Sequence, residues 1–141
     1  MTDPYELTVR VEPADIDALG HVNNIVYLRW VQEVATAHWQ AVAPAADQAG
    51  LLWMVVRHEI DYLHPAGPGD AVIARTWVGS AVGLRFDRHT EILRGLDRKP
   101  LAKARTVWVP IDPATGRPRR VSAAVRELFS TGVPAETPAI S

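Results

Sequence analysis

The sequence predicts an α+β protein in which a curved antiparallel sheet of about five strands wraps one long central helix. One segment, residues 24–42, carries apolar side chains over most of a helical circumference, as a largely buried helix does. The other long segments have the composition and alternation of strands, and four of them follow one another with short connections, which favours antiparallel pairing. Strands of about ten residues are longer than usual, so the sheet can curve around the helix.

The first strand is predicted over residues 5–12. Apolar Tyr5, Leu7, Val9 and Val11 alternate with polar residues, which is the period-2 pattern of a half-buried strand. Pro13 then removes a backbone donor and ends the pairing. Residues 14–24 are polar and contain a glycine, so they are predicted to form a loop.

The helix follows this loop and is predicted from Asn24 to Val42. Polar residues recur at steps of three and four along one narrow stripe, formed by Arg29, Gln32, Glu33, Thr36 and Gln40. The rest of the surface is apolar, so the helix is expected to be buried except along this stripe. Pro44 and the alanine-rich stretch that runs to Gly50 are expected to form its exit.

The remainder of the chain is predicted to be mostly strands. They are expected at residues 52–63, 70–80, 82–94 and 101–111, each bounded by Gly, Pro or Asp. A short helix is predicted over 123–129 with Ser122 as its cap. Residues 130–141 are expected to be a frayed tail. The 141 residues are expected to form one domain, with a core over about 5–125.

Composition removes several classes of function. The absence of cysteine excludes disulfides, zinc-thiolate sites and thiol nucleophiles. A formal charge of −1 supplies no strong cationic field, so neither nucleic acid nor a membrane is expected as a partner. The amino terminus shows no secretory signal, and a cytoplasmic location is expected.

The most informative stretch is residues 15–27, which read D-I-D-A-L-G-H-V-N-N-I-V-Y. This stretch resembles the signature of hotdog-fold acyl-CoA thioesterases of the 4-hydroxybenzoyl-CoA thioesterase type. Residues 58–66, 69–70, 108–112 and 115–118 support the resemblance more weakly. It implies a single hotdog domain that hydrolyses acyl-CoA without cofactor or metal. It also implies a homodimer or homotetramer whose sheets join edge to edge, with a site built from both subunits.

The chemistry of such a site can be argued from the residues themselves. Thioester hydrolysis needs an acid or base near the carbonyl carbon and hydrogen-bond donors at the carbonyl oxygen. An aspartate in a loop before a helix supplies the first, and free N–H groups of the first helical turn, around residues 23–25, supply the second. The carboxylate either attacks directly to give a mixed anhydride or activates a water molecule.

The resemblance assigns the catalytic role to Asp17 and a structural role to Asp15, which is expected to bond loop amides in an Asx-type turn. His21 is read as a site-lining residue, with a general base or a loop tie as alternatives. Asn23 and Asn24 can cap the helix or bond substrate. The residues expected to bind substrate are Gly20, His21, Val22, Asn23 and Asn24. Asp15, Asp17 and His21 are also conceivable metal ligands, although the resemblance implies none.

Other residues carry weaker hypotheses. Glu59 is a second candidate carboxylate or, more simply, a solvated strand residue. A basic group near one hairpin either meets the phosphates of coenzyme A or is surface charge; it comprises Arg85, Arg88, Arg94, Arg98 and Lys99. The acyl pocket is expected to be shaped by Trp30, Val31, Val34, Trp53 and Val55, together with the way subunits meet.

The sequence therefore predicts an acyl-CoA thioesterase and leaves the acyl group open. Two other functions remain compatible with the same residues. One is a non-catalytic hotdog protein that binds acyl thioesters, and the other is a thioesterase that acts on acyl groups attached to a carrier protein.

Overall fold

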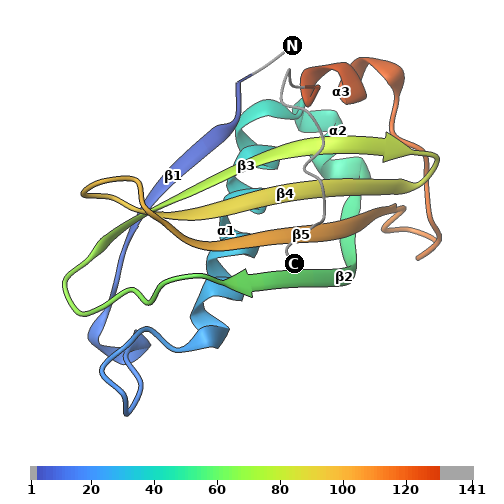
Figure 1. Cartoon of the computed structure of the whole chain (residues 1–141). Coiled ribbons are helices and arrows are strands. Elements are labelled where there is room, and N and C mark those ends of the chain that lie inside the picture. The colour runs from blue at the N-terminus through green and yellow to red at the C-terminus, as the bar shows by residue number, and fades with distance from the viewer. Residues whose placement is uncertain (1–2, 131–141) are drawn as a thin grey trace.

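The computed structural model describes residues 3–130 and contains one five-stranded sheet (Figure 1). The strands are β1 (Tyr5–Arg10), β2 (Leu52–Tyr62), β3 (Ala71–Val82), β4 (Arg85–Arg94) and β5 (Pro100–Ile111), and the helices are α1 (Asn24–Val42), α2 (Ala45–Gly50) and α3 (Ala123–Leu128). The sheet order is β1-β3-β4-β5-β2, with antiparallel pairing throughout. The predicted α+β architecture is confirmed, and α1 has the predicted bounds.

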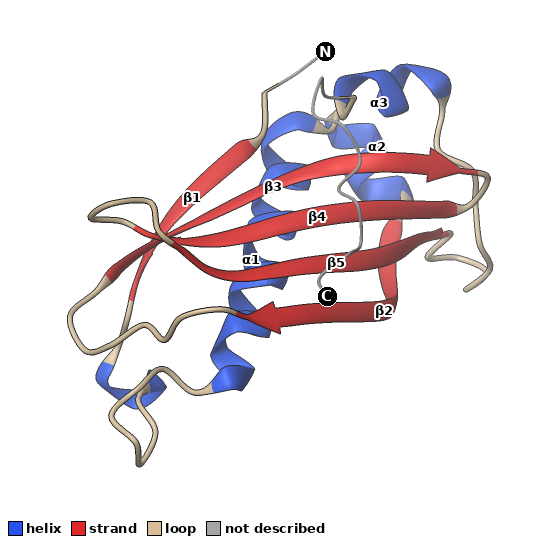
Figure 2. Ribbon diagram, in the orientation of Figure 1, coloured by secondary structure: helices blue, strands red, loops and turns tan. Residues whose placement is uncertain are grey.

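All five strands lie on one side of α1, so the helix forms a second layer behind the sheet (Figure 2). Its buried residues include Tyr27, Trp30, Val31 and Val34, each at most 2 % exposed. The predicted polar stripe is exposed or half-buried along its whole length. Register shifts interrupt β2 at Val55/Arg57 and β3 at Val78/Ser80. Such bulges increase local twist, which helps the sheet curve around the helix.

Two short elements differ from the sequence prediction. Residues predicted as a plain exit from α1 form the helix α2, whose alanine and glutamine residues are good helix formers. A 3-10 turn at Pro13–Asp15 occupies the start of the predicted loop. The predicted cap of α3 is confirmed, because the Ser122 hydroxyl accepts a hydrogen bond from the Val125 N–H at 3.2 Å. Of the predicted tail, residues 131–141 lie outside the described residues.

The core divides into two clusters that lie along α1. The first surrounds the amino-terminal half of the helix and includes Tyr27, Trp30 and Val31. The second surrounds its carboxyl-terminal end, where α3 and the residues on either side of it contribute Val121, Val125 and Phe129. The two ends of α1 therefore have different surroundings. The loop that contains Asp17 precedes its amino-terminal end, and a pocket lies near its carboxyl-terminal end. None of the helices within residues 3–130 combines the length and apolar character needed to span a membrane.

Candidate active site

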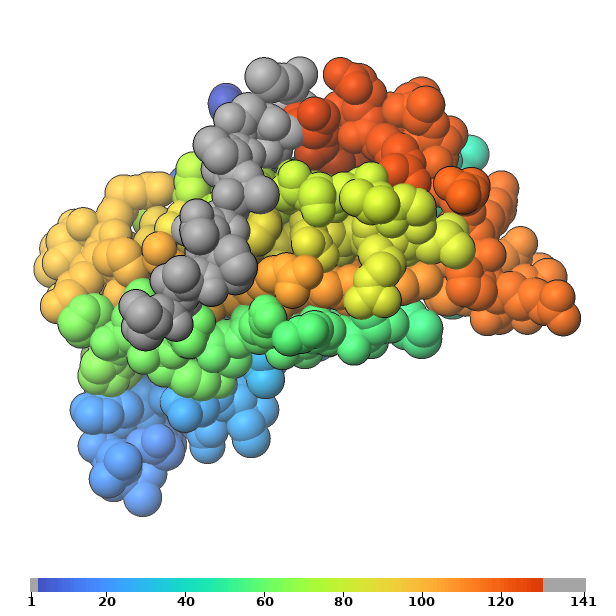
Figure 3. Space-filling model, turned by 45° about the vertical axis from the view of Figure 1, so that its right-hand side comes forward, coloured from blue at the N-terminus to red at the C-terminus, as the bar shows by residue number. Residues whose placement is uncertain are grey.

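The loop that precedes α1 is closed by short-range hydrogen bonds. The Asp17 N–H donates to the His21 carbonyl at 2.8 Å, and the Gly20 N–H donates to the Asp17 carbonyl at 3.0 Å. Gly20 has φ +80°, a left-handed conformation that residues with a side chain rarely adopt. Residues 13–24 stand out from the body of the molecule beside the green β2 region (Figure 3). The loop is thus a compact and well-defined projection.

Asp17 is held by one of its two carboxylate oxygens. Oδ1 accepts hydrogen bonds from the N–H of Leu19 at 2.9 Å and the N–H of His21 at 3.3 Å. Within residues 3–130, Oδ2 accepts no hydrogen bond and takes part in no ion pair. The side chain is therefore oriented by the loop and still has one oxygen available for chemistry.

Asp15 has a different environment. Its side chain is 4 % exposed, and it accepts hydrogen bonds from the Glu12 N–H at 2.8 Å and from Arg29 Nη2 at 3.0 Å. Burial acts to raise the pKa of Asp15, but the Glu12 amide and the Arg29 guanidinium together hold it below its usual value. The structural role predicted for Asp15 is confirmed. The predicted Asx-type turn is wrong, because the amide that it binds lies three residues earlier.

The start of α1 leaves one backbone donor unused. Asn23 is the N-cap, and its Oδ1 accepts from the Ile25 N–H at 3.1 Å. The Asn23 N–H donates to the Asp15 carbonyl at 2.8 Å, and the Val26 N–H donates to the Asn23 carbonyl at 2.9 Å. Among the described residues the Asn24 N–H has no acceptor. Of the three backbone N–H groups predicted as donors to substrate at residues 23–25, only that of Asn24 is therefore without an acceptor in residues 3–130 and free to donate.

The other residues expected to line the site lie in contrasting environments. His21 is exposed, as are Asn23 and Asn24. The Val22 side chain is 3 % exposed and belongs to the core, while its N–H donates to the Ala66 carbonyl at 2.9 Å. These contacts leave Val22 to anchor the loop rather than to meet substrate through its side chain.

Tyr62 ties the start of α1 to the end of β2. Its hydroxyl donates to the Asn24 carbonyl at 3.0 Å, and its ring packs edge-on against Tyr27. The Tyr27 hydroxyl in turn accepts a hydrogen bond from the Ala66 N–H at 2.9 Å. The loop with Asp17 and the carboxyl end of β2 therefore lie at the same end of the molecule.

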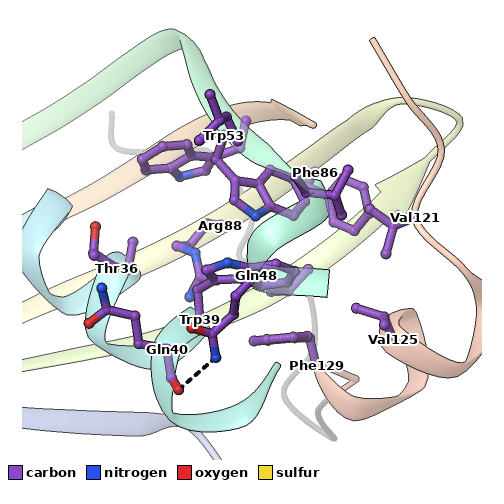
Figure 4. A pocket seen from close by; sticks show the side chains of 15 residues that line it. Thr36, Trp39, Gln40, Gln48, Trp53, Phe86, Arg88, Val121, Val125 and Phe129 are labelled. Carbon is purple, nitrogen blue, oxygen red and sulfur yellow. Dashed lines mark hydrogen bonds between the residues drawn. The ribbon is translucent and has the colours of Figure 1, made fainter. Parts of the chain in front are cut away.

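A pocket of about 300 Å³ lies at the opposite end of α1 (Figure 4). Five of its fifteen lining residues are aromatic, namely Trp39, Trp53, Phe86, Trp108 and Phe129. Asn24 and Thr36, which also lines the pocket, are twelve residues apart in the helix. At about 1.5 Å per residue they are separated by roughly 18 Å along its axis. The pocket and Asp17 of one chain are thus well separated.

The pocket differs from the one expected from the sequence. Trp53 lines it, but Trp30, Val31 and Val34 are at most 1 % exposed and lie in the core around the middle of α1. Val55 does not line it either. None of these four residues lines this pocket. For the three on α1 the reason is that an apolar pattern on a helix does not distinguish a residue that faces a cavity from one that is fully packed.

Arg88 is the one charged side chain that lines this pocket, among the residues the structure describes. It is 7 % exposed, and its Nη1 contacts His38 Nδ1 at 2.9 Å and Thr76 Oγ1 at 3.2 Å. Burial lowers the pKa of Arg88 to about 10. Burial and the neighbouring guanidinium lower the pKa of His38 to about 3. At neutral pH Arg88 is therefore charged and His38 is neutral.

Of the predicted basic group only Arg88 is buried, whereas Arg85, Arg94, Arg98 and Lys99 are exposed or half-buried. Arg88 faces α1, Arg98 is paired with Glu6 at 2.7 Å, and Arg94 lies 3.5 Å from Asp97. The buried position of Arg88 could have been predicted from the sequence. Arg88 is at every second position with Phe86, Thr90 and Ile92, so it shares their helix-facing side of β4, where all three are buried. Sequence reasoning also missed the pocket residues Trp39, Phe86, Trp108 and Phe129.

Two other hypotheses can be assessed from the contacts. Glu59 is paired with Arg57 at 3.1 Å and with Arg105 at 3.3 Å, so it is an ion-paired strand residue. Within residues 3–130, no three His, Asp or Glu side chains converge as metal ligands. Asp15, Asp17 and His21 accordingly do not form a metal site in this structure.

Comparison with known proteins gives a consistent result. Residues 11–129 match the sequence profile of the thioesterase-like superfamily. A curated relative, the chloroplastic acyl-acyl carrier protein thioesterase of Arabidopsis thaliana, is 23 % identical over 134 residues, which cover 92 % of this chain and 69 % of the relative.

Two solved structures illustrate the similarity of fold. A thioesterase from Thermus thermophilus, solved in complex with coenzyme A and Zn, has a TM-score of 0.80 and 28 % identity, covering 92 % of this chain and all of the other. A probable thioesterase from Escherichia coli has a TM-score of 0.75 and 22 % identity, covering 88 % of this chain and 95 % of the other.

Proposed function

The chain belongs to the thioesterase-like superfamily and is a thioester hydrolase; from this premise we propose that it hydrolyses acyl-CoA with Asp17 as the catalytic carboxylate. The observation that carries the proposal is the pair of unused groups at the start of α1. Asp17 Oδ2 and the Asn24 N–H are an available carboxylate oxygen and an available donor, and the loop between them is short and closed. The coenzyme A bound by the Thermus thermophilus relative supports acyl-CoA as the substrate class.

In the proposed reaction the two groups act on opposite ends of one carbonyl bond. The Asn24 N–H, at the positive end of the helix dipole, binds the carbonyl oxygen and stabilises the negative charge that develops there. Asp17 Oδ2 attacks the carbonyl carbon, the C–S bond breaks and the thiolate leaves. Water then hydrolyses the mixed anhydride. In the alternative route Oδ2 removes a proton from the water that attacks.

We further propose that the working enzyme is a homodimer paired through β2. This strand is bonded to β5 on one side and forms the edge of the described sheet. It also carries exposed apolar side chains, namely Leu52, Met54, Val56 and Tyr62. An exposed edge of eleven residues with such side chains favours pairing with another strand. A second copy of the same strand provides that partner through a two-fold axis.

Antiparallel pairing of two β2 strands would bring the Asp17 loop of one subunit close to the aromatic pocket of the other. Arg57 is the midpoint of Leu52–Tyr62, so a two-fold axis there sets the Leu52 end of one copy against the Tyr62 end of the other. Leu52 lines the aromatic pocket, and Tyr62 is bonded to the start of α1. The Asp17 loop of one subunit would therefore lie beside the pocket of its partner.

Asp17→Asn tests the catalytic assignment. The amide keeps the size and one acceptor but lacks the charge of a nucleophile or base. We expect kcat for thiol release from a panel of aliphatic and aromatic acyl-CoAs to fall by ~10²-fold or more. Asp15→Asn is the matched control and should reduce mainly stability. Near-normal turnover by a folded Asp17→Asn protein would refute the mechanism.

A mixing experiment tests whether the site is shared between subunits. Thr36→Trp places an indole at the pocket, whereas Asp17→Asn disables the loop. If each site takes its loop from one copy and its pocket from the other, a mixed dimer has one intact site. Random mixing should then restore about a quarter of wild-type activity. No recovery from two inactive variants, or a stable monomer of about 15.5 kDa by light scattering, contradicts the shared site.

A second candidate substrate class comes from the Arabidopsis thaliana relative, which acts on acyl groups held by acyl carrier protein. One acyl group forms the same thioester in its carrier-bound and CoA-bound forms. The two forms differ in what the pantetheine arm is attached to, which is the carrier protein in one and the rest of coenzyme A in the other. The ratio of kcat/KM for the two forms decides between them. A ratio that favours the carrier-bound form by ~10-fold or more would replace acyl-CoA as the proposed substrate.

A further inference from the structure

We propose that the aromatic pocket receives the distal end of an acyl group that carries a carboxylate, and that Arg88 pairs with this carboxylate. The substrate would then be the monothioester of a dicarboxylic acid. The inference rests on the proposed function, because it assumes that the pocket holds the acyl part of a thioester. It goes further in naming a chemical class of acyl group and the residue that selects it.

The first argument is the number of donors that Arg88 leaves unused. A guanidinium has five N–H donors, and the contacts with His38 and Thr76 involve Nη1 alone. Among the described residues, Nε and Nη2 have no hydrogen-bond partner. These three N–H groups form one side of the planar fork that binds a carboxylate through two parallel hydrogen bonds.

The second argument is charge. Arg88 is only 7 % exposed in a site whose other lining residues are uncharged, and no Asp or Glu of residues 3–130 pairs with it. Its contacts, a neutral imidazole and a threonine hydroxyl, do not neutralise it. A buried arginine without a counter-ion is costly, and an anionic ligand would supply the missing charge.

The third argument is the remaining surface of the pocket. Five aromatic side chains surround the space, and a volume of about 300 Å³ is at the lower end of small-molecule sites. That volume suits an acyl group rather than the whole of coenzyme A. The indole N–H groups of Trp53 and Trp108 are also buried without a partner within the described chain. Apart from Thr36, Gln40 and Gln48, the rest of the wall is apolar. Such a wall with one fixed cation is expected to select a largely apolar body with one anionic end.

Matched pairs of substrates test the inference on the wild-type protein. The carboxylated member of each pair is glutaryl-, adipoyl-, suberoyl- or 4-carboxybenzoyl-CoA. Its partner is pentanoyl-, hexanoyl-, octanoyl- or 4-methylbenzoyl-CoA, respectively. We expect kcat/KM to be at least ~10-fold higher for the carboxylated member in the pair whose length fits. A ratio of one or less in all four pairs overturns the inference.

Two variants assign the preference to Arg88. Arg88→Met removes the charge and should reduce the preference ratio by ~30-fold or more. Val78→Asp keeps Arg88 and gives it an internal counter-ion, because Val78 lines the pocket and is directly opposite Arg88 in the β3–β4 register. It should abolish the preference as well. Arg10→Met, an exposed arginine at the end of β1, is the control and should leave the ratio unchanged. A ratio that survives in folded Val78→Asp contradicts the role of Arg88.

A binding measurement separates failure of this inference from failure of the proposed function. If no acyl-CoA of either kind is hydrolysed, the proposed function fails. Calorimetry with free 4-methylbenzoate and its neutral amide, 4-methylbenzamide, still tests the pocket in that case. Saturable binding of 4-methylbenzoate that is tighter than that of 4-methylbenzamide and weakened by Val78→Asp supports the carboxylate site. Equal binding of the acid and the amide, or no binding of either, overturns it.

Discussion

Replacing Asp15 by alanine is expected to lower the free energy of unfolding by about 2–4 kcal/mol. The loop that carries Asp17 begins at this carboxylate, which binds the Glu12 amide at 2.8 Å and Arg29 at 3.0 Å. The Asp15 carbonyl also accepts the Asn23 N–H, so the residue joins the 3-10 turn to the start of α1. The change therefore tests what holds the proposed catalytic loop in place.

The two contacts of the Asp15 side chain should contribute unequally. The bond from the Glu12 N–H is charge-assisted and shielded from water, and such bonds contribute about 1.5–3 kcal/mol. The Arg29 side chain is 49 % exposed, and ion pairs of that kind contribute about 1 kcal/mol or less. Arg29→Ala is consequently the matched control, with an expected loss of no more than about 1 kcal/mol.

The effect should also depend on pH. The pKa of Asp15 in the folded protein is below its ordinary value of 3.8, so the carboxylate stabilises the fold at pH values above about 4. That stabilisation is lost as the pH falls through the lower, folded-state pKa. The difference between wild type and Asp15→Ala should thus be full at pH 7 and much smaller near pH 2.5.

Urea denaturation followed by circular dichroism, at one fixed protein concentration, measures all three proteins. Two results would refute the reasoning. One is a loss in Arg29→Ala that equals the loss in Asp15→Ala, which would make the ion pair the main support of the loop. The other is a deficit in Asp15→Ala that is the same at pH 2.5 and at pH 7.

Three further predictions concern single side chains. Gly20→Ala should cost about 1–2 kcal/mol in a thermal melt, because an added Cβ meets no atom within 4 Å and only the φ of +80° opposes it; an unchanged Tm would show that the loop adopts another conformation. His21→Ala should lower kcat/KM by less than ~10-fold, since the side chain is exposed, and a loss of several orders of magnitude would make His21 the general base. Trp30→Ala should cost about 3–5 kcal/mol in urea denaturation, because the indole is 1 % exposed in the main core, and a loss below about 1 kcal/mol would contradict its assignment to that core.

Helices and strands were predictable from the sequence where the helical or the alternating pattern of apolar residues runs without interruption. The bounds of α1 follow from the polar stripe and from Asn23, and both are properties of neighbouring residues. The bulges in β2 and β3 and the helix α2 were not predicted. A bulge depends on how one strand fits against another, and a short helix depends on what covers it, so neither has a strong local signal.

The same distinction applies to the candidate site. The contacts of Asp15 and Asn23 join residues at most fourteen positions apart, and the sequence predicted a structural role for Asp15 and a possible cap at Asn23. The pocket instead brings together residues as far apart as Ala35 and Phe129. Arg88 reaches His38 across fifty positions. Such neighbours are set by the strand order and by the register of β3 on β4, which composition and spacing do not reveal.

The length of α1 is the reason for proposing that the two parts of the site combine across two chains. Roughly 18 Å of helix separates the donor at Asn24 from the pocket at Thr36, so within one chain a short acyl group cannot reach both. The proposed pairing through β2 would remove this constraint, because it would set the amino-terminal end of α1 in one subunit beside the carboxyl-terminal end of α1 in the other. None of the described residues that line the pocket belongs to the Asp17 loop. Substitutions at Arg88 or Val78 should accordingly change which acyl group is accepted, while Asp17 and the Asn24 N–H, which are proposed to act on the thioester, keep their positions.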